Sequence, residues 1–336
     1  MKSLSLFLSI AVALGATVPS APLHAQGEIR AQSGEATQEP RSVWITLGTR
    51  GGPVASSSRS QPANLLRVGN RNYLVDAGDG TAGQLIKVGV PTAQIDAVLI
   101  SHLHFDHFGG LQALLGLRWQ TNAPRALRIY GPPGTRETVE GIVASMVPAT
   151  TAGYGIPGAP LVPPQETIEV FELRDGDVID MDGIAVTARS NTHYSYPEGS
   201  DLAQRFESLS LRFDMADRSI AYTGDTGPSS AVEELARGAD LLVAEMMDVQ
   251  DTIAMVRRNS PNLDAANAAA MEQHLSTHHL VPADVGILAS RAEVGAVVVT
   301  HFVGVETGHP KHFEYLREIA EHFDGPVVIA NDIQAF

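Results

Sequence analysis

A run of histidines with one aspartate, Ser101-His102-Leu103-His104-Phe105-Asp106-His107, is the strongest chemical signal in this sequence. It follows the apolar stretch 97–100, which is typical of a buried strand. In extended backbone, His102 and His104 point the same way because they are two residues apart. Imidazole nitrogens and a carboxylate suit Zn²⁺, with Fe and Mn as competitors. The segment predicts a metal site, and a His-rich surface loop without metal is the alternative.

One short segment cannot supply every ligand, so the others must come from distant parts of the chain. Three candidates follow expected strands: His193, Asp225 in a Gly-Asp-Thr turn, and His301. Each is a weak signal alone, because a histidine after a strand is often merely solvated or capped, and Asp225 equally fits an Asx turn. Their occurrence together with the first segment indicates ligation, since loops at strand ends gather into sites.

The elements that must position these residues alternate between strands and helices. Apolar runs predict strands at 43–47, 64–68, 72–75, 97–100, 127–130, 184–188, 208–213, 219–223, 241–244 and 296–300. Helices are expected at 81–88, 111–117, 231–237 and 283–293. The segment 147–164, rich in Pro, Gly, Ala and Thr, is expected to be an inserted loop, either a lid or plain surface. This rhythm predicts an α/β protein built as a four-layer αββα sandwich.

Composition excludes several classes of protein. The 336 residues include 23 Lys or Arg, 38 Asp or Glu and no Cys, which gives a net charge of −15. Without Cys there can be no disulfide framework, thiolate zinc site, iron–sulfur cluster or cysteine nucleophile. The acidic balance argues against a nucleic-acid partner, because such binding depends on Lys and Arg neutralising phosphates. With 44% apolar and 18% charged residues, the chain can bury a core.

The N-terminus has the pattern of a secretory signal. Lys2 precedes an apolar run from Leu4 to Val18, and Ala25 suits a cleavage site. A membrane anchor is the alternative, but the run is short of the ~20 residues of a membrane span. We expect a signal peptide over 1–25, a flexible leader over 26–40 and one folded domain over 41–336. This organisation predicts a periplasmic or secreted protein with no stable membrane insertion after cleavage.

The ordered set of ligands resembles the metallo-β-lactamase-fold hydrolase superfamily, from about Trp44 to Phe336. The resemblance implies two Zn²⁺ per chain, with Fe or Mn possible in one site. It implies that one zinc is held by His102, His104 and His193, the other by Asp106, His107 and His301, with Asp225 bridging both. Asp76 matches a position that orients a ligand histidine; a cap on the following helix is its alternative role.

Further motifs resemble the tRNase Z and arylsulfatase-like branch: the Gly48-Thr49 and Gly52-Pro53 turn, the Tyr130-to-Thr135 segment, Ala244-Glu245 and His278-His279. That branch has a histidine 22 residues before the last metal histidine, which is His279 here. His279, Glu245 and Asp106 are therefore the implied catalytic residues, with Glu245 orienting His279 as a proton donor. His278 and His274 are rivals for that role. The glycine turn is one residue longer than the compact family version, and Leu280-Val281-Pro282 replaces small hydroxyl residues.

These features predict an exported dinuclear zinc hydrolase whose metal-bound hydroxide attacks a small ester, a sulfate or phosphate ester of the arylsulfatase-like kind. A lactonase or β-lactam hydrolase on the same scaffold is one alternative. A non-catalytic periplasmic metal-binding protein is an alternative of another class. The expected partner is a small-molecule ester and not a nucleic acid, and the oligomeric state is not indicated. Pocket walls are expected from 147–164, 194–206 and 246–275, with Tyr154, Tyr194, Tyr196 and Phe206 as aromatic candidates.

Overall fold

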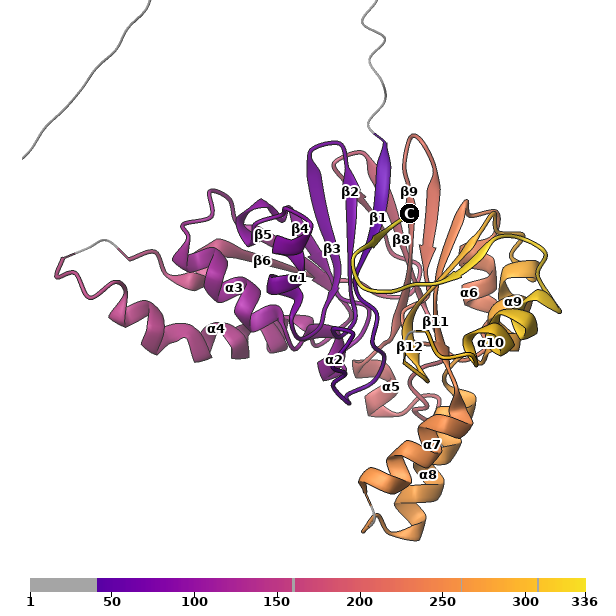
Figure 1. Ribbon diagram of the computed structural model, residues 1–336. Helices are drawn as coiled ribbons and strands as arrows, with labels where there is room; N and C mark the ends of the chain where they lie inside the picture. The colour runs from indigo at the N-terminus through magenta and orange to yellow at the C-terminus, as the bar shows by residue number, and fades with distance from the viewer. Residues whose placement is uncertain (1–40, 159–160, 261, 307) are drawn as a thin grey trace, which may run out of the picture. The chain divides into compact units, whose positions relative to one another are not determined.

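The computed structural model describes residues 41–158, 161–260, 262–306 and 308–336, and Figure 1 shows the arrangement of their elements. Within this part, the strands form two sheets. The first sheet contains β1 (Ser42–Gly48), β2 (Ala63–Val68), β3 (Arg71–Ala77), β4 (Ala97–Leu99), β5 (Leu127–Gly131), β6 (Ile168–Glu172) and β14 (Gln334–Ala335), in the order β14-β1-β2-β3-β4-β5-β6. The second contains β7 (Val178–Met181), β8 (Ile184–Ser190), β9 (Leu209–Asp214), β10 (Ser219–Tyr222), β11 (Leu241–Met247), β12 (Val297–Val303) and β13 (Val327–Ile329), in the order β13-β12-β11-β10-β9-β8-β7.

Helices lie outside the sheets and at their edges. The α-helices of the described residues are α1 (Thr81–Lys87), α2 (Phe105–Phe108), α3 (Leu111–Gln120), α4 (Thr135–Ala152), α5 (Asp201–Arg205), α6 (Ser230–Ala236), α7 (Val249–Asn259), α8 (Ala265–Thr277), α9 (Pro282–Arg291) and α10 (His312–Ala320). Short 3₁₀ turns, η1 (Thr92–Gln94) and η2 (Pro164–Thr167), complete them. Among these residues, no helix combines the length and the apolar character that crossing a membrane requires.

The principal core lies between the two sheets. Trp44 of the first sheet is fully buried, with its ring centroid 5.9 Å from that of Phe213 and 5.8 Å from that of Tyr222 in the second sheet. The outer face of the first sheet packs on α1, α3 and α4, and that of the second on α6, α9 and α10, through buried residues such as Leu85, Leu114, Val139, Val285 and Ile319. The predicted four-layer αββα sandwich is confirmed.

Strand direction explains why distant polar residues meet. Strands β3, β4, β5 and β6 are parallel, as are β10, β11, β12 and β13. Because β9 is antiparallel to both β8 and β10, β8 runs in the same direction as β10. The C-terminal ends of β8, β10, β11 and β12 therefore lie at one edge of the second sheet. Loops that leave this edge can bring their side chains together.

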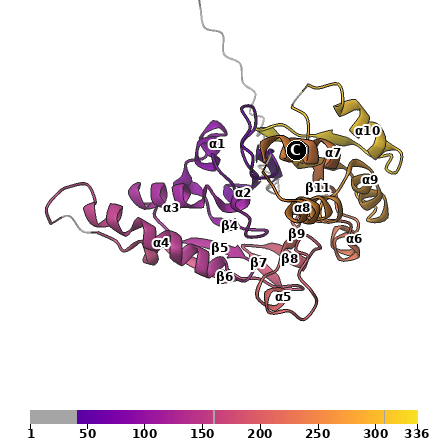
Figure 2. The same cartoon turned by 90° about the horizontal axis from the view of Figure 1, so that it is seen from below.

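Helices α7 and α8 form a hairpin that extends from the same edge, as Figure 1 shows in orange. Seen from below in Figure 2, α2, α7 and α8 lie around this edge. Each helix of the hairpin begins at an aspartate cap: Asp248 accepts a hydrogen bond from the Asp251 amide, and Asp264 from the amides of Ala266 and Asn267. The sequence prediction had placed no helix here.

The prediction for 147–164 was wrong in its first third. Helix α4 continues through Pro148 to Ala152, so only the residues beyond Gly153 belong to a loop, in which 159 and 160 lie outside the described residues. Proline usually ends a helix because it lacks an amide hydrogen. Here the preceding turns of α4, anchored by the buried Val139 and Met146, carry the helix past it.

Candidate metal centre

The segment after β4 places four of the predicted ligands at the edge of the sheets. His102 is fully buried in extended chain, and His104 is the N-cap residue of the short helix α2. Asp106 and His107 lie inside α2 and are both buried. The change from strand to helix turns all four side chains toward one space, and the spacing had predicted this for His102 and His104.

Loops of the second sheet bring the other three predicted ligands to this segment. His193 follows β8, and its Nε2 lies 3.0 Å from Nδ1 of His104. Asp225 follows β10, with Oδ1 3.3 Å from Nε2 of His107 and Oδ2 3.2 Å from Nε2 of His301. His301 lies within β12. All seven residues predicted from the sequence thus come together.

Several groups of three side chains bring potential ligand atoms within 4.8 Å of one another, and two of these groups match the predicted ligand sets. One is His102, His104 and His193, and the other is Asp106, His107 and His301. Asp225 lies between them. Its Oδ2 is 3.8 Å from Nε2 of both His102 and His193, while its carboxylate is closer to the histidines of the other group. This placement is the one expected of a carboxylate shared by two cations.

The donor set fits divalent cations. His102 Nε2, His107 Nε2 and Asp225 Oδ1 are buried and make no hydrogen bond. Buried polar atoms without partners cost free energy, and a cation would satisfy all three. Burial raises the pKa of the Asp225 carboxyl, but the neighbouring His301 and His107 outweigh burial and lower that pKa well below its ordinary value. The carboxylate is therefore charged at neutral pH, as a bridging ligand must be.

Asp76 holds His107 from behind. Its Oδ2 lies 2.8 Å from His107 Nδ1 and accepts a hydrogen bond of 2.7 Å from the Tyr222 hydroxyl. Ser101 donates to it from both its amide and its hydroxyl, at 2.7 and 2.8 Å. These bonds direct Nε2 of His107 into the site. The alternative role of Asp76 as a helix cap is excluded, because the N-cap of α1 is Gly80, without a side-chain cap.

His279 and Glu245 form a buried pair beside the two groups. His279 Nδ1 lies 2.8 Å from Glu245 Oε2, and Glu245 Oε1 accepts a 2.6 Å hydrogen bond from the Thr226 amide. Burial lowers the pKa of His279, but the charge of Glu245 and its hydrogen bond outweigh burial and raise that pKa to about 9. The rival His278 faces a backbone oxygen instead, with Nδ1 2.5 Å from the Thr192 carbonyl.

His274, the other rival, also lies at the site, although it is not paired with Glu245. Its ring centroid on α8 is 5.3 Å from that of His193 and 5.6 Å from that of His279. Burial and the neighbouring His279 and His278 lower its pKa to about 4, so His274 is neutral at pH 7. No feature of the sequence favoured His274 over its neighbours, because a helix at this position was not predicted.

A cavity of about 400 Å³ opens over the two groups. Its polar side is formed by His104, Asp106, His193, Asp225, His274, His279 and His301. The glycine turn after β1 forms part of the rim, where a Cβ on Gly51 would lie 2.7 Å from His301 Nδ1. Only glycine fits this close approach. The opposite side comes from α7 and α8, in agreement with the expectation that 246–275 contributes a wall.

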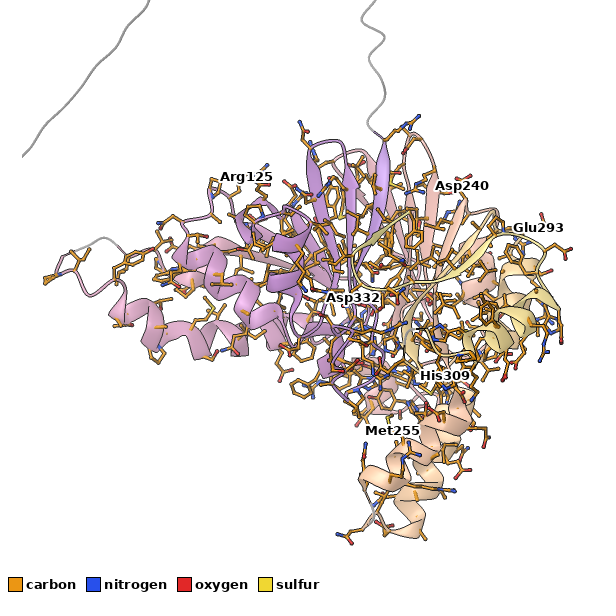
Figure 3. The ribbon with its side chains drawn as sticks, in the orientation of Figure 1. Arg125, Asp240, Met255, Glu293, His309 and Asp332 are labelled. Carbon is orange, nitrogen blue, oxygen red and sulfur yellow. The ribbon has the colours of Figure 1, made fainter. Side chains whose placement is uncertain are left out.

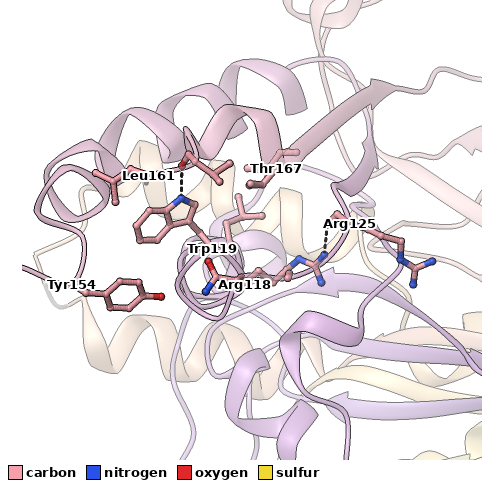
Figure 4. Close-up of a pocket in the computed structure, with 11 residues that line it drawn as sticks. Arg118, Trp119, Arg125, Tyr154, Leu161 and Thr167 are labelled. Carbon is pink, nitrogen blue, oxygen red and sulfur yellow. Dashed lines mark hydrogen bonds between the residues drawn. The ribbon is translucent and has the colours of Figure 1, made fainter. Parts of the chain in front are cut away.

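The aromatic candidates divide between two places. Tyr194 lies against the site, with its ring centroid 5.5 Å from that of His104 and its hydroxyl 3.1 Å from the Leu103 amide. Tyr154 instead lines a separate pocket of about 150 Å³ with Trp119 and Leu161, shown in Figure 4. In the described residues, the segment 147–164 therefore borders that pocket and contributes nothing to the lining of the site cavity.

Comparison with known proteins agrees with this fold and site. Residues 71–302 match the model of the Beta-lactamase superfamily domain. Ribonuclease Z of Mycobacterium marinum is 33% identical over 295 residues, which cover 87% of this chain and 97% of that protein. The chain belongs to the metallo-β-lactamase superfamily, in its ribonuclease Z branch. Membership of this branch identifies it as a metal-dependent hydrolase.

Solved structures share the fold of this superfamily. The metallo-beta-lactamase fold protein YhfI from Bacillus subtilis superimposes with a TM-score of 0.64 at 19% identity, covering 89% of this chain and 99% of its own. Human tRNase Z, short form, superimposes with a TM-score of 0.59 at 22% identity, covering 88% of this chain and 98% of its own.

Three predictions from the sequence are corrected by these relatives. The prediction of an arylsulfatase-like hydrolase of small esters was wrong, because the similar proteins are named for nuclease activity. The two alternatives to it, a lactonase or β-lactam hydrolase and a non-catalytic metal-binding protein, are overturned by the same finding. The exclusion of nucleic acid was wrong for the same reason. It rested on the net charge of the whole chain, which does not measure how one cavity with bound cations meets a phosphate.

The prediction of a periplasmic or secreted protein was also wrong. It conflicts with the similarity to a ribonuclease Z, which covers 87% of this chain. It rested on the signal peptide and leader assigned to 1–25 and 26–40, and these residues lie outside the described ones. A lysine before a short apolar run is a pattern of composition, and a pattern of this kind does not by itself determine export.

Proposed function

We propose that the protein hydrolyses phosphodiester bonds of RNA at a site that holds two divalent cations, zinc in both or zinc with iron or manganese. The observation that carries the proposal is the buried His279–Glu245 pair beside two ligand groups with Asp225 between them. Similarity to ribonuclease Z over most of the chain supports RNA as the substrate.

The seven ligands would act as two sets of three with Asp225 between them. His102, His104 and His193 would hold one cation, and Asp106, His107 and His301 the other, in the ligand chemistry that zinc prefers. When bound, such cations stabilise negative charge on a phosphoryl group and lower the pKa of water. Asp76 would fix the ring of His107 through Nδ1, which leaves Nε2 for the cation.

His279 would protonate the departing oxygen. An RNA sugar hydroxyl is a poor leaving group, so breaking its bond to phosphorus requires a proton in the transition state. With a pKa raised to about 9, His279 is protonated at neutral pH and can donate. Glu245 accepts the hydrogen bond from Nδ1, which directs Nε2 toward the cavity that His279 lines. His279 is the catalytic residue here, and Glu245 positions it.

Direct assay of RNA cleavage tests this proposal. The full chain, loaded with zinc, is incubated with a transfer-RNA transcript and with an unstructured oligoribonucleotide, and the products are separated by size. We expect the parent protein to cleave RNA and the Asp225→Ala variant to lose this activity. Absence of cleavage of every RNA by protein that contains two equivalents of metal would contradict the proposed function.

A further inference from the structure

One wall of the site cavity is largely apolar. Helix α7 supplies Met255 and Val256, helix α8 supplies Met271 and Leu275, and the end of β11 supplies Met247. Among the described residues, neither Lys nor Arg lines the cavity. The hydroxyl of Thr252 also borders this wall, but it donates a 2.6 Å hydrogen bond to the Asp248 carbonyl. We call the five apolar side chains the hairpin wall.

The hairpin wall lies next to the proposed proton donor. Met271, His274 and Leu275 are three and four residues apart on α8, so their side chains share one face of the helix. The ring centroid of His274 is 5.6 Å from that of His279, which follows the end of α8. Figure 3 labels Met255 where the hairpin leaves the sheets. The group that receives a proton from His279 therefore departs beside this wall.

We propose that the hairpin wall binds the base of the leaving nucleotide by apolar contact and does not distinguish one base from another. This proposal rests on the proposed function. Reading a base requires donors and acceptors placed against its edge. The five side chains of the hairpin wall offer only methionine sulfur, a weak acceptor, and that of Met255 already accepts a contact of 3.8 Å from Arg50 Nη2. The imidazole of His274, on the same face of α8, lies against the rings of His193 and His279. Every base has a flat apolar face, and thioether and aliphatic groups can pack on it whatever its identity. A base at this position thus strengthens substrate binding, and each of the four bases does so to a similar extent.

Oligoribonucleotides with one changed nucleotide test this requirement. The leaving nucleotide, recognised because it carries the new hydroxyl group after cleavage, is made A, C, G, U or an abasic ribose. We expect kcat/KM for the four bases to agree within about threefold, and the abasic substrate to be at least about tenfold poorer, because it loses the apolar surface that a base would bury against the wall.

Variants of Met255 test whether the dependence of kcat/KM on the base arises at the hairpin wall. Met255→Ala should lower kcat/KM for base-containing substrates and leave the abasic substrate unchanged, and Met255→Leu should restore most of the difference. Leu263→Ala is the matched control, because Leu263 lies in the turn of the same hairpin and does not line the cavity. Binding gives a readout without turnover: a nucleoside monophosphate should bind more tightly than ribose phosphate to the parent protein, and equally to Met255→Ala.

The outcomes separate this proposal from the proposed function. RNA cleavage with equal rates on abasic and base-containing substrates would overturn the hairpin wall as a base site and leave the nuclease activity standing. A preference of more than about tenfold for one base would overturn the claim that identity is not read. Failure to cleave any oligoribonucleotide would contradict the proposed function and, with it, this proposal.

Discussion

His279 Nδ1 lies 2.8 Å from Glu245 Oε2, and both side chains are buried beside the seven predicted metal ligands. Glu245 is held in turn by the Thr226 amide, so the carboxylate can hold the imidazole in one orientation. A buried carboxylate raises the basicity of a histidine and fixes which nitrogen faces the substrate.

Replacing His279 by Ala should lower kcat for RNA by about 10²–10⁴-fold, because general acid catalysis is typically worth that much. Metal content should stay at that of the parent protein, since His279 is not assigned as a ligand. A nitrophenyl phosphodiester, whose leaving group needs little protonation, should lose much less. His278→Ala is the control, because that ring faces the Thr192 carbonyl. Loss of metal from His279→Ala would show that His279 is a ligand and refute the assignment.

The pH profile should fall on its alkaline side. His279 must be protonated to donate, and it loses its proton as the pH rises through its pKa of about 9. Bound cations repel the imidazolium, so the fall in kcat/KM is expected at or below about pH 9. Glu245→Gln removes the charge that raises this pKa and should move the fall to lower pH. A fall at the same pH in both proteins would exclude His279 as its source.

Asp76→Asn should weaken metal binding by about 10–100-fold, as loss of a carboxylate behind a ligand histidine typically does. The substitution keeps the shape of the side chain and removes the charge that faces His107 Nδ1. Zinc affinity can be measured by competition with a chelator. Asp240→Asn is the matched control, because Asp240 is a surface carboxylate that accepts a hydrogen bond from the Ser219 amide. Equal affinity in the two variants would leave Asp76 with a purely structural role.

Trp44→Ala should lower the free energy of unfolding by about 3–5 kcal/mol, the usual cost of removing a large aromatic side chain from a core. Trp44 is fully buried between the sheets against Phe213 and Tyr222. Chemical denaturation followed by circular dichroism measures the change. A loss below about 1 kcal/mol would mean that the space between the sheets collapses around the gap.

Most of the ligand set could be predicted from the sequence because four of its members share one short segment and the others each lie near the C-terminal end of an expected strand. Strands that run in one direction bring their C-terminal ends to one edge, so the ligands after β8, after β10 and within β12 are expected to approach that segment. The edge at which these residues meet could be predicted from the alternation of strands and helices, and the apolar runs indicate that alternation.

The hairpin wall could not be read in the same way. The signals were present: Asp264 precedes an alanine-rich stretch, as a cap precedes a helix. Which face of α8 turns toward the site depends on tertiary packing, and this placed His274 and Met271 in the cavity. The exclusion of nucleic acid from the net charge was wrong for a related reason, because the value of −15 is a sum over the whole chain. Substrate class depends on the local surroundings of one cavity.

The metal content of the Asp225→Ala variant shows whether one carboxylate serves two cations. Asp225 lies 3.2–3.8 Å from the facing nitrogens of four histidines, which are His102, His107, His193 and His301. Elemental analysis of the purified full chain should find about two equivalents of metal in the parent protein. The variant, shown to be folded by circular dichroism, should retain less than one equivalent and lose RNA cleavage. Retention of both metals by the folded variant would contradict the shared site.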